Sequence, residues 1–391
     1  MISRRSLGSV GPRIAIISDT VDDENGVCIG LRRLVAAARA AGHEASLIGA
    51  AKPGVVDEVV RIPSAMTASL PIYPDMTWSV PELPPIAAWL SKNADLVQVS
   101  TPGPMGIAGL IAARMVGLPV IAQYHTEVAE YAARMTGMPM VRMLVEPIVG
   151  WFYKQADLCL APSEAVENRL ASFGIPSDRI WRVQRGVDRS LFDPARRDRA
   201  ALARFGITNE PVALYVGRLS KEKNLDTLTA VWSQIHAARP DAKLLVVGSE
   251  GPLRGTFKAP GMIEAGSLYG TELATVFASS DLFMFPSETE TFGNVVIEAA
   301  ASGIPALVAT LGASREHMID GVTGRIVDAS DRAAFAATAI SLLDNADLRA
   351  RMGAAAREHV TRYDLANAVR ATWDIYARVM AEREAALGVA S

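Results

Sequence analysis

The stretch that decides the fold is Asp281-Leu-Phe-Met-Phe-Pro-Ser-Glu-Thr-Glu-Thr-Phe-Gly-Asn-Val-Val-Ile-Glu298. Its apolar run ends at Pro286, and Gly293 precedes an apolar-rich segment, which predicts a buried strand, a polar loop and the start of a helix. In that order these parts are typical of the carboxyl edge of a parallel sheet. Backbone amides and the positive end of the helix favour an anionic ligand there. The stretch therefore predicts a parallel α/β fold and a ligand site.

Two carboxylates, Glu290 and Glu298, flank this helix start. One interpretation is structural, because an acid in a loop and an acid in the first turn suit the helix dipole. The other is functional, because a carboxylate accepts hydrogen bonds from ligand hydroxyls. The stretch alone leaves both interpretations open.

The same alternation of strand and helix runs through both halves of the chain. Residues 13–18 form a β-rich apolar run, residues 27–41 follow as an apolar-periodic helix, and residues 45–49 give the next strand. Residues 211–216 restart the pattern in the second half. This alternation predicts doubly wound parallel sheets, and a length of 391 residues predicts two domains of about 150–200 residues each.

Composition excludes several classes of function. The net charge is −3 and no basic stripe carries interleaved aromatics, so we expect no nucleic-acid partner. Cys28 and Cys159 lie far apart without CxxC spacing, which argues against a disulfide framework and a thiolate metal site. No stretch approaches ~18 uninterrupted apolar residues, and residues 1–10 are more typical of a frayed terminus than of a signal peptide. We therefore expect a cytoplasmic protein that at most lies on a membrane surface.

Two residues of the first half follow strands at the edge where parallel sheets bind ligands. Gly26 lies where the first strand turns into the first helix, so its backbone can approach a phosphate or sugar, although turn geometry alone also explains a glycine. His125 lies just past the strand at 119–123, and a buried structural histidine is the competing interpretation. Position alone decides neither case.

Two further segments bear on the acceptor. Residues 62–85 are rich in proline and carry Tyr73 and Trp78, and we expect a long loop on the rim. Residues 138–154 form a helix rich in methionine and aromatic residues. Methionines at helical spacing usually pack in the core, but beside Arg142 and other cations they also suit an acyl chain or a bilayer surface. Both interpretations of this helix remain open.

A pair of cations follows the strand at 211–216. Arg218 and Lys223 project from the loop that leads into the next helix. They suit a diphosphate, with the arginine as a bidentate clamp and the lysine as a point charge, although surface cations are common. The sequence has no cluster of metal ligands, no Walker loop, no GxGxxG before a helix and no GxSxG elbow.

Together, four motifs resemble those of the family 4 retaining glycosyltransferases: residues 217–225, residues 286–298 with two glutamates separated by seven residues, residues 299–305 and residues 321–324. The resemblance covers nearly the whole chain, with Gly26, residues 124–126 and residues 186–188 in the expected places. It implies the GT-B fold, in which two Rossmann-like domains face each other across a cleft. The implied parts are an acceptor domain at 1–190, a nucleotide-sugar donor domain at 191–365, and a C-terminal helix at 366–391 that packs back on the first domain.

The resemblance also implies roles for individual residues. Arg218 and Lys223 would hold the donor's phosphates, Glu290 would bind hydroxyls of the transferred sugar, and Glu298 would bind the ribose hydroxyls. His125 would contact the donor sugar near its anomeric centre. The implied catalytic set is His125, Glu290, Arg218 and Lys223. The implied donor-binding set is Gly26, Arg218, Lys223, Glu290, Phe292, Gly293 and Glu298, with Phe292 and Gly293 presenting backbone amides.

The implied activity is transfer of a hexose from a nucleotide diphosphate sugar to an acceptor hydroxyl, with no cofactor and no metal. The departing phosphate oxygen takes the acceptor's proton, so no side-chain nucleophile is expected. Residues 100–104, 124–127 and 185–188 are most similar to the branch that glycosylates lipids, such as mannosyl and diacylglycerol glycosyltransferases. Many relatives carry asparagine in place of Arg185 and aspartate in place of Glu127, which leaves the acceptor details open. The expected acceptor is a sugar or a lipid, and a lipid would place the protein at the inner face of the cell membrane.

Two alternatives compete with this function. A GT-B sugar-nucleotide epimerase needs acid and base side chains on both sides of the sugar, and only His125 and Glu290 qualify. A non-catalytic protein that binds nucleotide sugars would retain donor binding without turnover.

Overall fold

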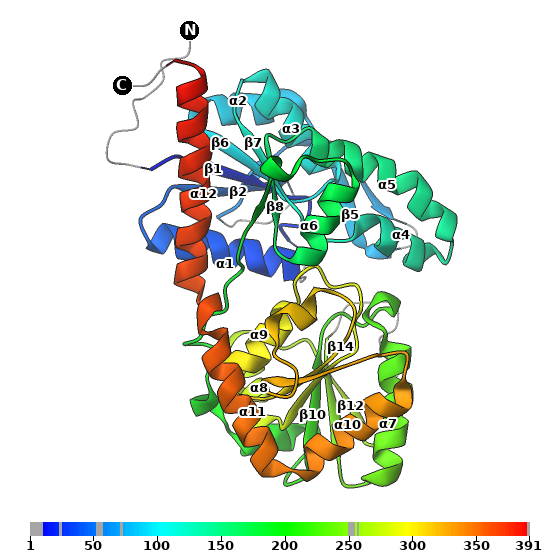
Figure 1. The fold of residues 1–391 in the computed structure, drawn as a ribbon. Coiled ribbons are helices and arrows are strands. Elements are labelled where there is room, and N and C mark those ends of the chain that lie inside the picture. Colours follow the sequence, from blue (N-terminus) through cyan, green and yellow to red (C-terminus); the bar gives the residue numbers. More distant parts are fainter. Residues whose placement is uncertain are drawn as a thin grey trace. The chain divides into compact units, whose positions relative to one another are not determined.

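The computed structural model describes residues 11–22, 26–51, 58–70, 73–248, 255 and 258–388. The chain divides into two compact units (Figure 1). The first unit comprises Met1–Gln184 and Ala366–Ser391, and the second comprises Arg185–Leu365. The basic lead at residues 1–10 lies outside the described residues.

A parallel seven-stranded sheet forms the centre of the first unit, in the order β3-β2-β1-β6-β7-β8-β9. Its strands are β1 (Ile14–Ile17), β2 (Ala45–Ala50), β3 (Val60–Ile62), β6 (Leu96–Val99), β7 (Val120–Gln123), β8 (Leu158–Ala161) and β9 (Ile180–Arg182). Every residue of β1, β6, β7 and β8 is buried, which is why these strands are almost wholly apolar rather than alternating. The strand order reverses between β1 and β6, so this is the switch point where doubly wound sheets bind ligands.

The helices of this unit connect the parallel strands (Figure 1). They are α1 (Gly26–Ala40), α2 (Leu83–Asn93), α3 (Pro104–Met115), α4 (Val128–Thr136), α5 (Pro139–Lys154), α6 (Glu164–Ser172) and η1 (Ser177–Arg179). The last helix of the chain, α12 (Leu365–Ala386), also packs here.

Buried polar contacts attach α12 to the first sheet. The Tyr376 hydroxyl donates to Gln98 Oε1 at 2.5 Å, and Gln98 Nε2 donates to Gln123 Oε1 at 3.0 Å. Trp373 stacks on His43 with ring centroids 4.9 Å apart. Because Gln98 and Gln123 belong to neighbouring strands, this chain of hydrogen bonds fixes the helix against the sheet.

The two chain segments that join the units are paired with each other within the second unit. Val187 and Asp364 form a parallel β-bridge, the Val187 amide donates to the Tyr363 carbonyl at 2.8 Å, and the Leu365 amide donates to the Val187 carbonyl at 3.2 Å. The second unit is therefore a continuous insertion whose beginning and end lie side by side.

The rim segment at 62–85 is not a loop, and that expectation was wrong. Two strands, β4 (Ser64–Leu70) and β5 (Tyr73–Pro81), form an antiparallel ribbon. Thr67 Oγ1 and Ser79 Oγ lie 3.2 Å apart across it. Both strands of such a ribbon are edges, where proline is tolerated because not every amide must donate. The many prolines therefore did not exclude strands. The side chains of Tyr73 and Trp78 lie outside the part that the structure describes.

A second parallel sheet of six strands organises the second unit, in the order β12-β11-β10-β13-β14-β15. Its strands are β10 (Val212–Val216), β11 (Lys243–Val247), β12 (Met262–Gly266), β13 (Leu282–Phe285), β14 (Ala306–Ala309) and β15 (Gly324–Val327). Its helices are η2 (Pro194–Arg196), η3 (Arg199–Phe205), η4 (Lys221–Lys223), α7 (Leu225–Ala238), α8 (Gly270–Ser279), α9 (Asn294–Ala301), η5 (Ala313–His317), α10 (Arg332–Asp344), α11 (Ala346–His359) and η6 (Val360–Tyr363). The two doubly wound parallel sheets predicted from the sequence are confirmed.

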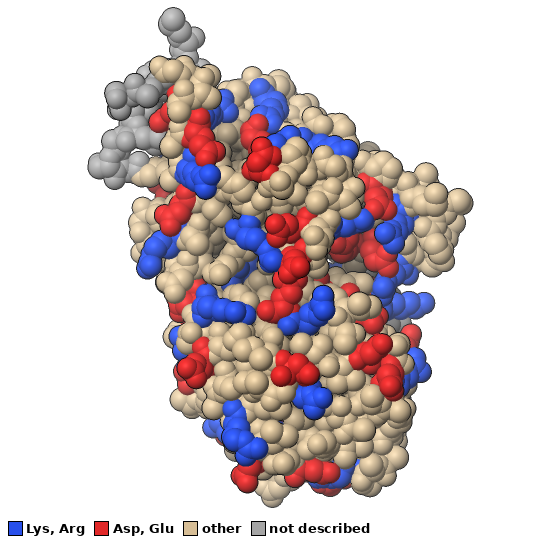
Figure 2. Space-filling model, viewed as in Figure 1, with Lys and Arg blue, Asp and Glu red and all other residues tan. Residues whose placement is uncertain are grey.

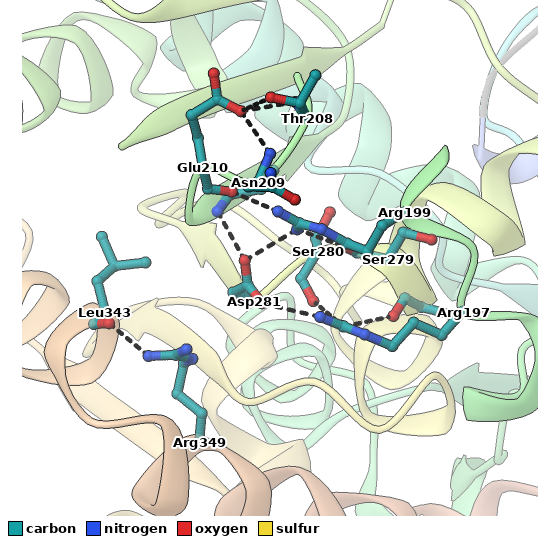
Figure 3. Close-up of polar contacts among 12 residues, drawn as sticks. Arg197, Arg199, Thr208, Asn209, Glu210, Ser279, Ser280, Asp281, Leu343 and Arg349 are labelled. Atoms are coloured by element: carbon teal, nitrogen blue, oxygen red, sulfur yellow. Dashed lines mark hydrogen bonds and ion pairs between the residues drawn. The ribbon is translucent and has the colours of Figure 1, made fainter. Parts of the chain in front are cut away.

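A cluster of charges closes the amino edge of this second sheet (Figure 3). Asp281 immediately precedes β13, and its carboxylate accepts hydrogen bonds from Arg197 and Arg199, each at 3.2 Å, and from the Val212 amide at 2.8 Å. The two arginines also donate to the carbonyls of Ala278 and Ser279, both at 3.0 Å. We call Arg197, Arg199 and Asp281 the amino-edge cluster. It ties residues 197–199 to the starts of β10 and β13.

Candidate functional site

Two loops meet at the switch point of the second sheet. The order of the strands reverses between β10 and β13, so the loops that follow these neighbours share one carboxyl edge. The β10 loop is residues 217–224 and the β13 loop is residues 286–293. These loops carry all but three of the site residues that the sequence predicted. Gly26 and His125 lie in the first unit, and Glu298 follows the β13 loop in α9.

Hydrogen bonds fasten the two loops to each other. Asn224 Nδ2 donates to the Pro286 carbonyl at 3.2 Å, and Thr289 Oγ1 donates to the Glu222 carbonyl at 3.0 Å. Asn224 has φ 57°, a left-handed conformation that no other non-glycine residue in the described ranges adopts. Such a conformation costs about 1–3 kcal/mol and is typical of functional sites, where the surrounding structure enforces it. The geometry of this edge is therefore fixed by the fold.

Lys223 and Glu290 form an ion pair across these loops. Lys223 Nζ donates to Glu290 Oε1 at 2.5 Å, and Ser287 Oγ donates to the same oxygen at 2.9 Å. Only 22% of the lysine side chain and 13% of the glutamate side chain are exposed, which strengthens their attraction relative to a surface pair. Two residues predicted as functional from separate motifs thus lie together. Arg218 belongs to the same loop, and its carbonyl accepts from the Tyr215 hydroxyl at 3.2 Å.

Arg185 is a further cation of this site, and the sequence analysis did not include it among the site residues. Its guanidinium carbon lies 5.6 Å from the centre of the Phe292 ring. Burial lowers the pKa of Arg185 to about 10, and the charge of Glu290 opposes that shift. Arg185 therefore stays charged at neutral pH near the Glu290 carboxylate. The only signal in the sequence was a cation where many relatives carry asparagine.

His317 supports the end of the β13 loop and was also missed. Its Nε2 lies 2.6 Å from the Phe292 carbonyl, its Nδ1 lies 3.0 Å from the Tyr363 hydroxyl, and its ring packs 4.1 Å from that of Phe292. Burial lowers the pKa of His317 to about 4, so the ring is neutral at pH 7. A neutral ring that donates from Nε2 to the carbonyl accepts at Nδ1 from the tyrosine. No local sequence pattern marks this support.

The helix that follows the loop begins at Gly293, as expected. Gly293 is the N-cap of α9, with φ 88°, and no side-chain hydrogen bond caps the helix there. A Cβ on this residue would lie 2.4 Å from Ser314 Oγ, so both the backbone and the packing require glycine. Phe292 is buried, and Glu298 lies further along α9 with 7% of its surface exposed.

The first unit supplies the two other predicted residues, Gly26 and His125. Gly26 begins α1, and a Cβ there would meet no atom of the described residues within 4 Å. Packing against those residues therefore does not require glycine at this position, and the close approach of a ligand is one explanation. His125 follows β7 and is buried, with 8% of its surface exposed.

The switch point of the first sheet holds a buried carboxyl group, that of Asp19. Asp19 follows β1, and its carboxylate accepts from Thr101 Oγ1 at 2.6 Å and from the amides of Met105 and Gly106 at 2.7 and 3.3 Å. Burial raises the pKa of Asp19, and these hydrogen bonds counteract the rise. The carboxylate occupies the position at the start of α3 that a bound anion would take. The start of α3 is therefore capped by a side chain of the protein itself.

The surface of α5 is apolar. Met140, Met143, Leu144, Ile148 and Trp151 are all exposed, Met143 and Leu144 to 73% and 69%. Met140, Leu144, Ile148 and Trp151 follow one another at three or four residues, and Met143 lies beside Leu144. The five side chains therefore share one face of the helix, which we call the α5 stripe. Core packing, one of the two interpretations of these methionines, is wrong for Met140 and Met143. Figure 2 shows that this end of the first unit carries mostly uncharged surface.

Two absences concern the described residues only. Within those ranges, no three side chains of histidine, cysteine, aspartate or glutamate come together as metal ligands would. The helices in the described part of the chain are too short or too polar to cross a membrane. The expectation that catalysis needs no metal stays a prediction.

Two family models match the chain. The model described as Glycosyltransferase Family 4 matches residues 25–191, and the model described as Glycosyl transferases group 1 matches residues 199–359. A GDP-mannose-dependent alpha-mannosyltransferase of Mycobacterium tuberculosis is 33% identical over 81% of this chain and 84% of its own length. The sulfoquinovosyl transferase SQD2 of Arabidopsis thaliana is 31% identical over 80% of this chain and 62% of its own length.

Solved structures share the fold. A sucrose-phosphate synthase from Thermosynechococcus elongatus superposes with a TM-score of 0.77 at 21% identity, covering 95% of this chain and all of that one. The Anabaena protein Alr3699/HepE, in complex with UDP and glucose, gives a TM-score of 0.75 at 17% identity, covering 94% of this chain and all of that one.

Proposed function

Because the chain belongs to the family 4 glycosyltransferases, which transfer sugar from nucleotide sugars to acceptors, we propose that it moves a hexose with retention of the anomeric configuration. The proposed donor is a nucleoside diphosphate hexose and the proposed acceptor is a hydroxyl of a sugar or a lipid. The observation that carries the proposal is the Lys223–Glu290 pair at the switch point between β10 and β13. It joins a cation for the diphosphate to a carboxylate for the sugar.

These contacts support the following proposal for the donor site. Arg218 and Lys223 would bind the phosphates, with Lys223 exchanging the Glu290 carboxylate for a phosphate oxygen. Glu290 would then accept hydrogen bonds from sugar hydroxyls while Ser287 Oγ continues to donate to its Oε1 and the Arg185 cation lies nearby. Glu298, in α9, would bind the ribose hydroxyls.

The proposed chemistry balances without a cofactor or a side-chain nucleophile. The acceptor oxygen attacks the anomeric carbon on the face from which the donor's diphosphate departs. The bond between that carbon and the phosphate oxygen breaks, and its electron pair stays on the departing oxygen, which takes the acceptor's proton. The cations and the amides of α9 stabilise the charge that develops on the diphosphate. His125 would contact the sugar near the anomeric carbon.

Product stereochemistry tests this function. GDP-mannose is the first donor to try, because relatives at 31–33% identity are named GDP-mannose-dependent alpha-mannosyltransferases, followed by UDP- and ADP-hexoses. We expect NMR to show an α-linked product from an α-linked donor. An inverted product, or donor binding without transfer to any sugar or lipid acceptor, would contradict the proposal. Conversion of the donor into an epimer would instead favour a sugar-nucleotide epimerase.

A substitution at Glu290 provides the first test of the site. Glu290→Gln keeps the shape of the side chain but removes the charge that orients the sugar hydroxyls. We expect turnover to fall about 100-fold, the usual size of a lost polar contact in a transition state. Near-normal turnover by a folded Glu290→Gln variant would show that Glu290 does not bind the sugar.

We further propose that the α5 stripe lies on a lipid bilayer. Its Met, Leu, Ile and Trp side chains form a continuous apolar face, as in helices that lie in the membrane interface. The neighbouring charges pair with one another: Arg142 contacts Glu146 and Glu130 at 3.3 and 3.5 Å, and Arg134 contacts Glu130 at 2.7 Å. Attachment would therefore depend on apolar burial more than on anionic lipids.

Vesicle sedimentation tests this attachment. We expect the protein to sediment with phosphatidylcholine vesicles, and added phosphatidylglycerol to change binding only slightly. Replacing Met143 and Leu144 together by glutamate should lower the partition coefficient at least about tenfold, because two large apolar side chains no longer enter the bilayer. Leu387→Glu changes an exposed residue outside the stripe and is the control. A wild-type protein that stays in solution, or one that dimerises through the stripe, would contradict attachment without affecting glycosyl transfer.

A further inference from the structure

Ser314 carries a buried hydroxyl group with no hydrogen-bond partner among the described residues. The residue lies in η5 and is fully buried, and its Oγ makes no hydrogen bond within those ranges. Such a group destabilises a folded protein, and native structures contain few of them. Its place in the fold therefore calls for a physical reason.

The hydroxyl points at the residue that begins α9. A Cβ built on Gly293 would lie 2.4 Å from Ser314 Oγ but 3.2 Å from Ser314 Cβ, so the oxygen is the nearer atom. Gly293 offers no side chain to cap the helix, and the first turn of α9 contains no acidic residue. In the first turn of α9 the Val296 amide already donates to the Gly293 carbonyl at 3.0 Å. The amides before it are those that attract an anion at a helix start. A neutral hydrogen-bond donor thus stands beside an uncapped helix start.

The surroundings hold this hydroxyl in place. The Ala313 amide donates to the Glu290 carbonyl at 2.9 Å, which fixes η5 against the β13 loop. The Glu290 carboxylate already accepts from Lys223 and Ser287 through one oxygen. Ser314 therefore sits beside the proposed donor site, on a segment bonded directly to one of its main residues.

We propose that Ser314 Oγ donates a hydrogen bond to a phosphate oxygen of the nucleoside diphosphate, and that it forms one anion site with the first turn of α9. This inference rests on the proposed function and extends its donor site. The hydroxyl and the amides are neutral donors, so they complement the charges of Arg218 and Lys223. A phosphate oxygen satisfies the serine and the helix start at once.

Calorimetric titration with GDP, UDP and ADP tests the inference. Ser314→Ala should raise the Kd of the nucleotide that binds the wild-type protein at least about tenfold, because a hydrogen bond to a charged phosphate is lost. Ser302→Ala is the matched control: Ser302 is also buried with an unpartnered Oγ within the described residues, but it lies at the other end of α9. Its Kd should equal that of the wild type.

Melting without nucleotide separates binding from folding. Neither variant loses a hydrogen bond among the described residues, so both should melt at or slightly above the wild-type temperature. Unchanged binding by Ser314→Ala would overturn this inference alone. So would a melting temperature that falls for Ser314→Ala but not for Ser302→Ala, since the hydroxyl would then be structural. A wild-type protein that binds none of the three nucleotides would overturn the proposed function as well.

Discussion

Strand β13 has a cation–carboxylate contact at each end, and the two contacts are built differently. At its beginning, the carboxylate of Asp281 joins Arg197, Arg199 and a backbone amide, and both arginines also donate to carbonyls (Figure 3). Beyond its end, Lys223 Nζ donates only to Glu290 among the described residues. The groups of the first contact also form hydrogen bonds with the backbone. The second contact is one hydrogen bond from Lys223 Nζ, which a ligand oxygen can replace.

The difference shows how one strand serves stability and binding. Removing the Asp281 carboxylate leaves the Val212 amide without its acceptor and takes an ion-pair partner from both arginines, so it should cost folding free energy. Exchanging Glu290 for a phosphate at Lys223 replaces one charged hydrogen bond by another, so it should cost little. Three predictions test this contrast.

The largest effect is expected at the amino edge. Asp281→Ala leaves the Val212 amide without its acceptor and removes two partly exposed ion pairs. We expect the free energy of unfolding to fall by about 3 kcal/mol, most of it from the unsatisfied amide. Urea unfolding measures this change. Asp281→Asn, which keeps one acceptor oxygen, should lose less. If Asp281→Ala unfolds like the wild type, the cluster is only a surface feature.

Acid should destabilise the fold at the carboxyl edge of the second sheet, because His317, which supports the end of the β13 loop, is buried in its neutral form. The folded pKa is about 4 and the ordinary value is 6.5, so between these values the unfolded state binds more protons and stability falls as the pH falls. Above pH 6.5, protonation of His317 does not lower the free energy of unfolding. By pH 5 it lowers the free energy of unfolding by about 2 kcal/mol. Urea unfolding from pH 7 to 5 should show a shallower decline for His317→Gln than for the wild type. Parallel pH profiles would contradict this assignment.

The smallest effect on folding is expected at Lys223. Lys223→Ala should raise the Kd of the nucleoside diphosphate about tenfold, as expected for one charged hydrogen bond. Its melting temperature should change far less than that of Asp281→Ala, because Glu290 keeps Ser287 and the nearby Arg185. Unchanged nucleotide affinity would contradict the phosphate role and with it the contrast between the two ends of the strand.

The sequence predicted the sheets because their strands are continuous apolar runs that end at glycine, proline or polar residues. It also predicted Lys223 and Glu290 separately, since each follows such a strand. Their pairing was not predictable, because it depends on how two loops 67 residues apart bend toward each other. Arg185 and His317 were missed because their partners are distant in sequence. Ser314 was missed because the burial of its hydroxyl depends on how η5 packs in the folded chain. The spacing of the α5 stripe was visible, but whether other elements cover it was not.

The bridge between Val187 and Asp364 affects the order in which the two units can fold during synthesis. The ribosome must complete the whole second unit before it delivers α12, which supplies Trp373 and Tyr376 to the first unit. The unit that is synthesised first therefore finishes folding last. Until α12 is in place, the Gln98 side-chain oxygen in the middle of the first sheet lacks the hydrogen bond from the Tyr376 hydroxyl. Truncation within α12 should accordingly damage the first unit while the inserted second unit folds normally.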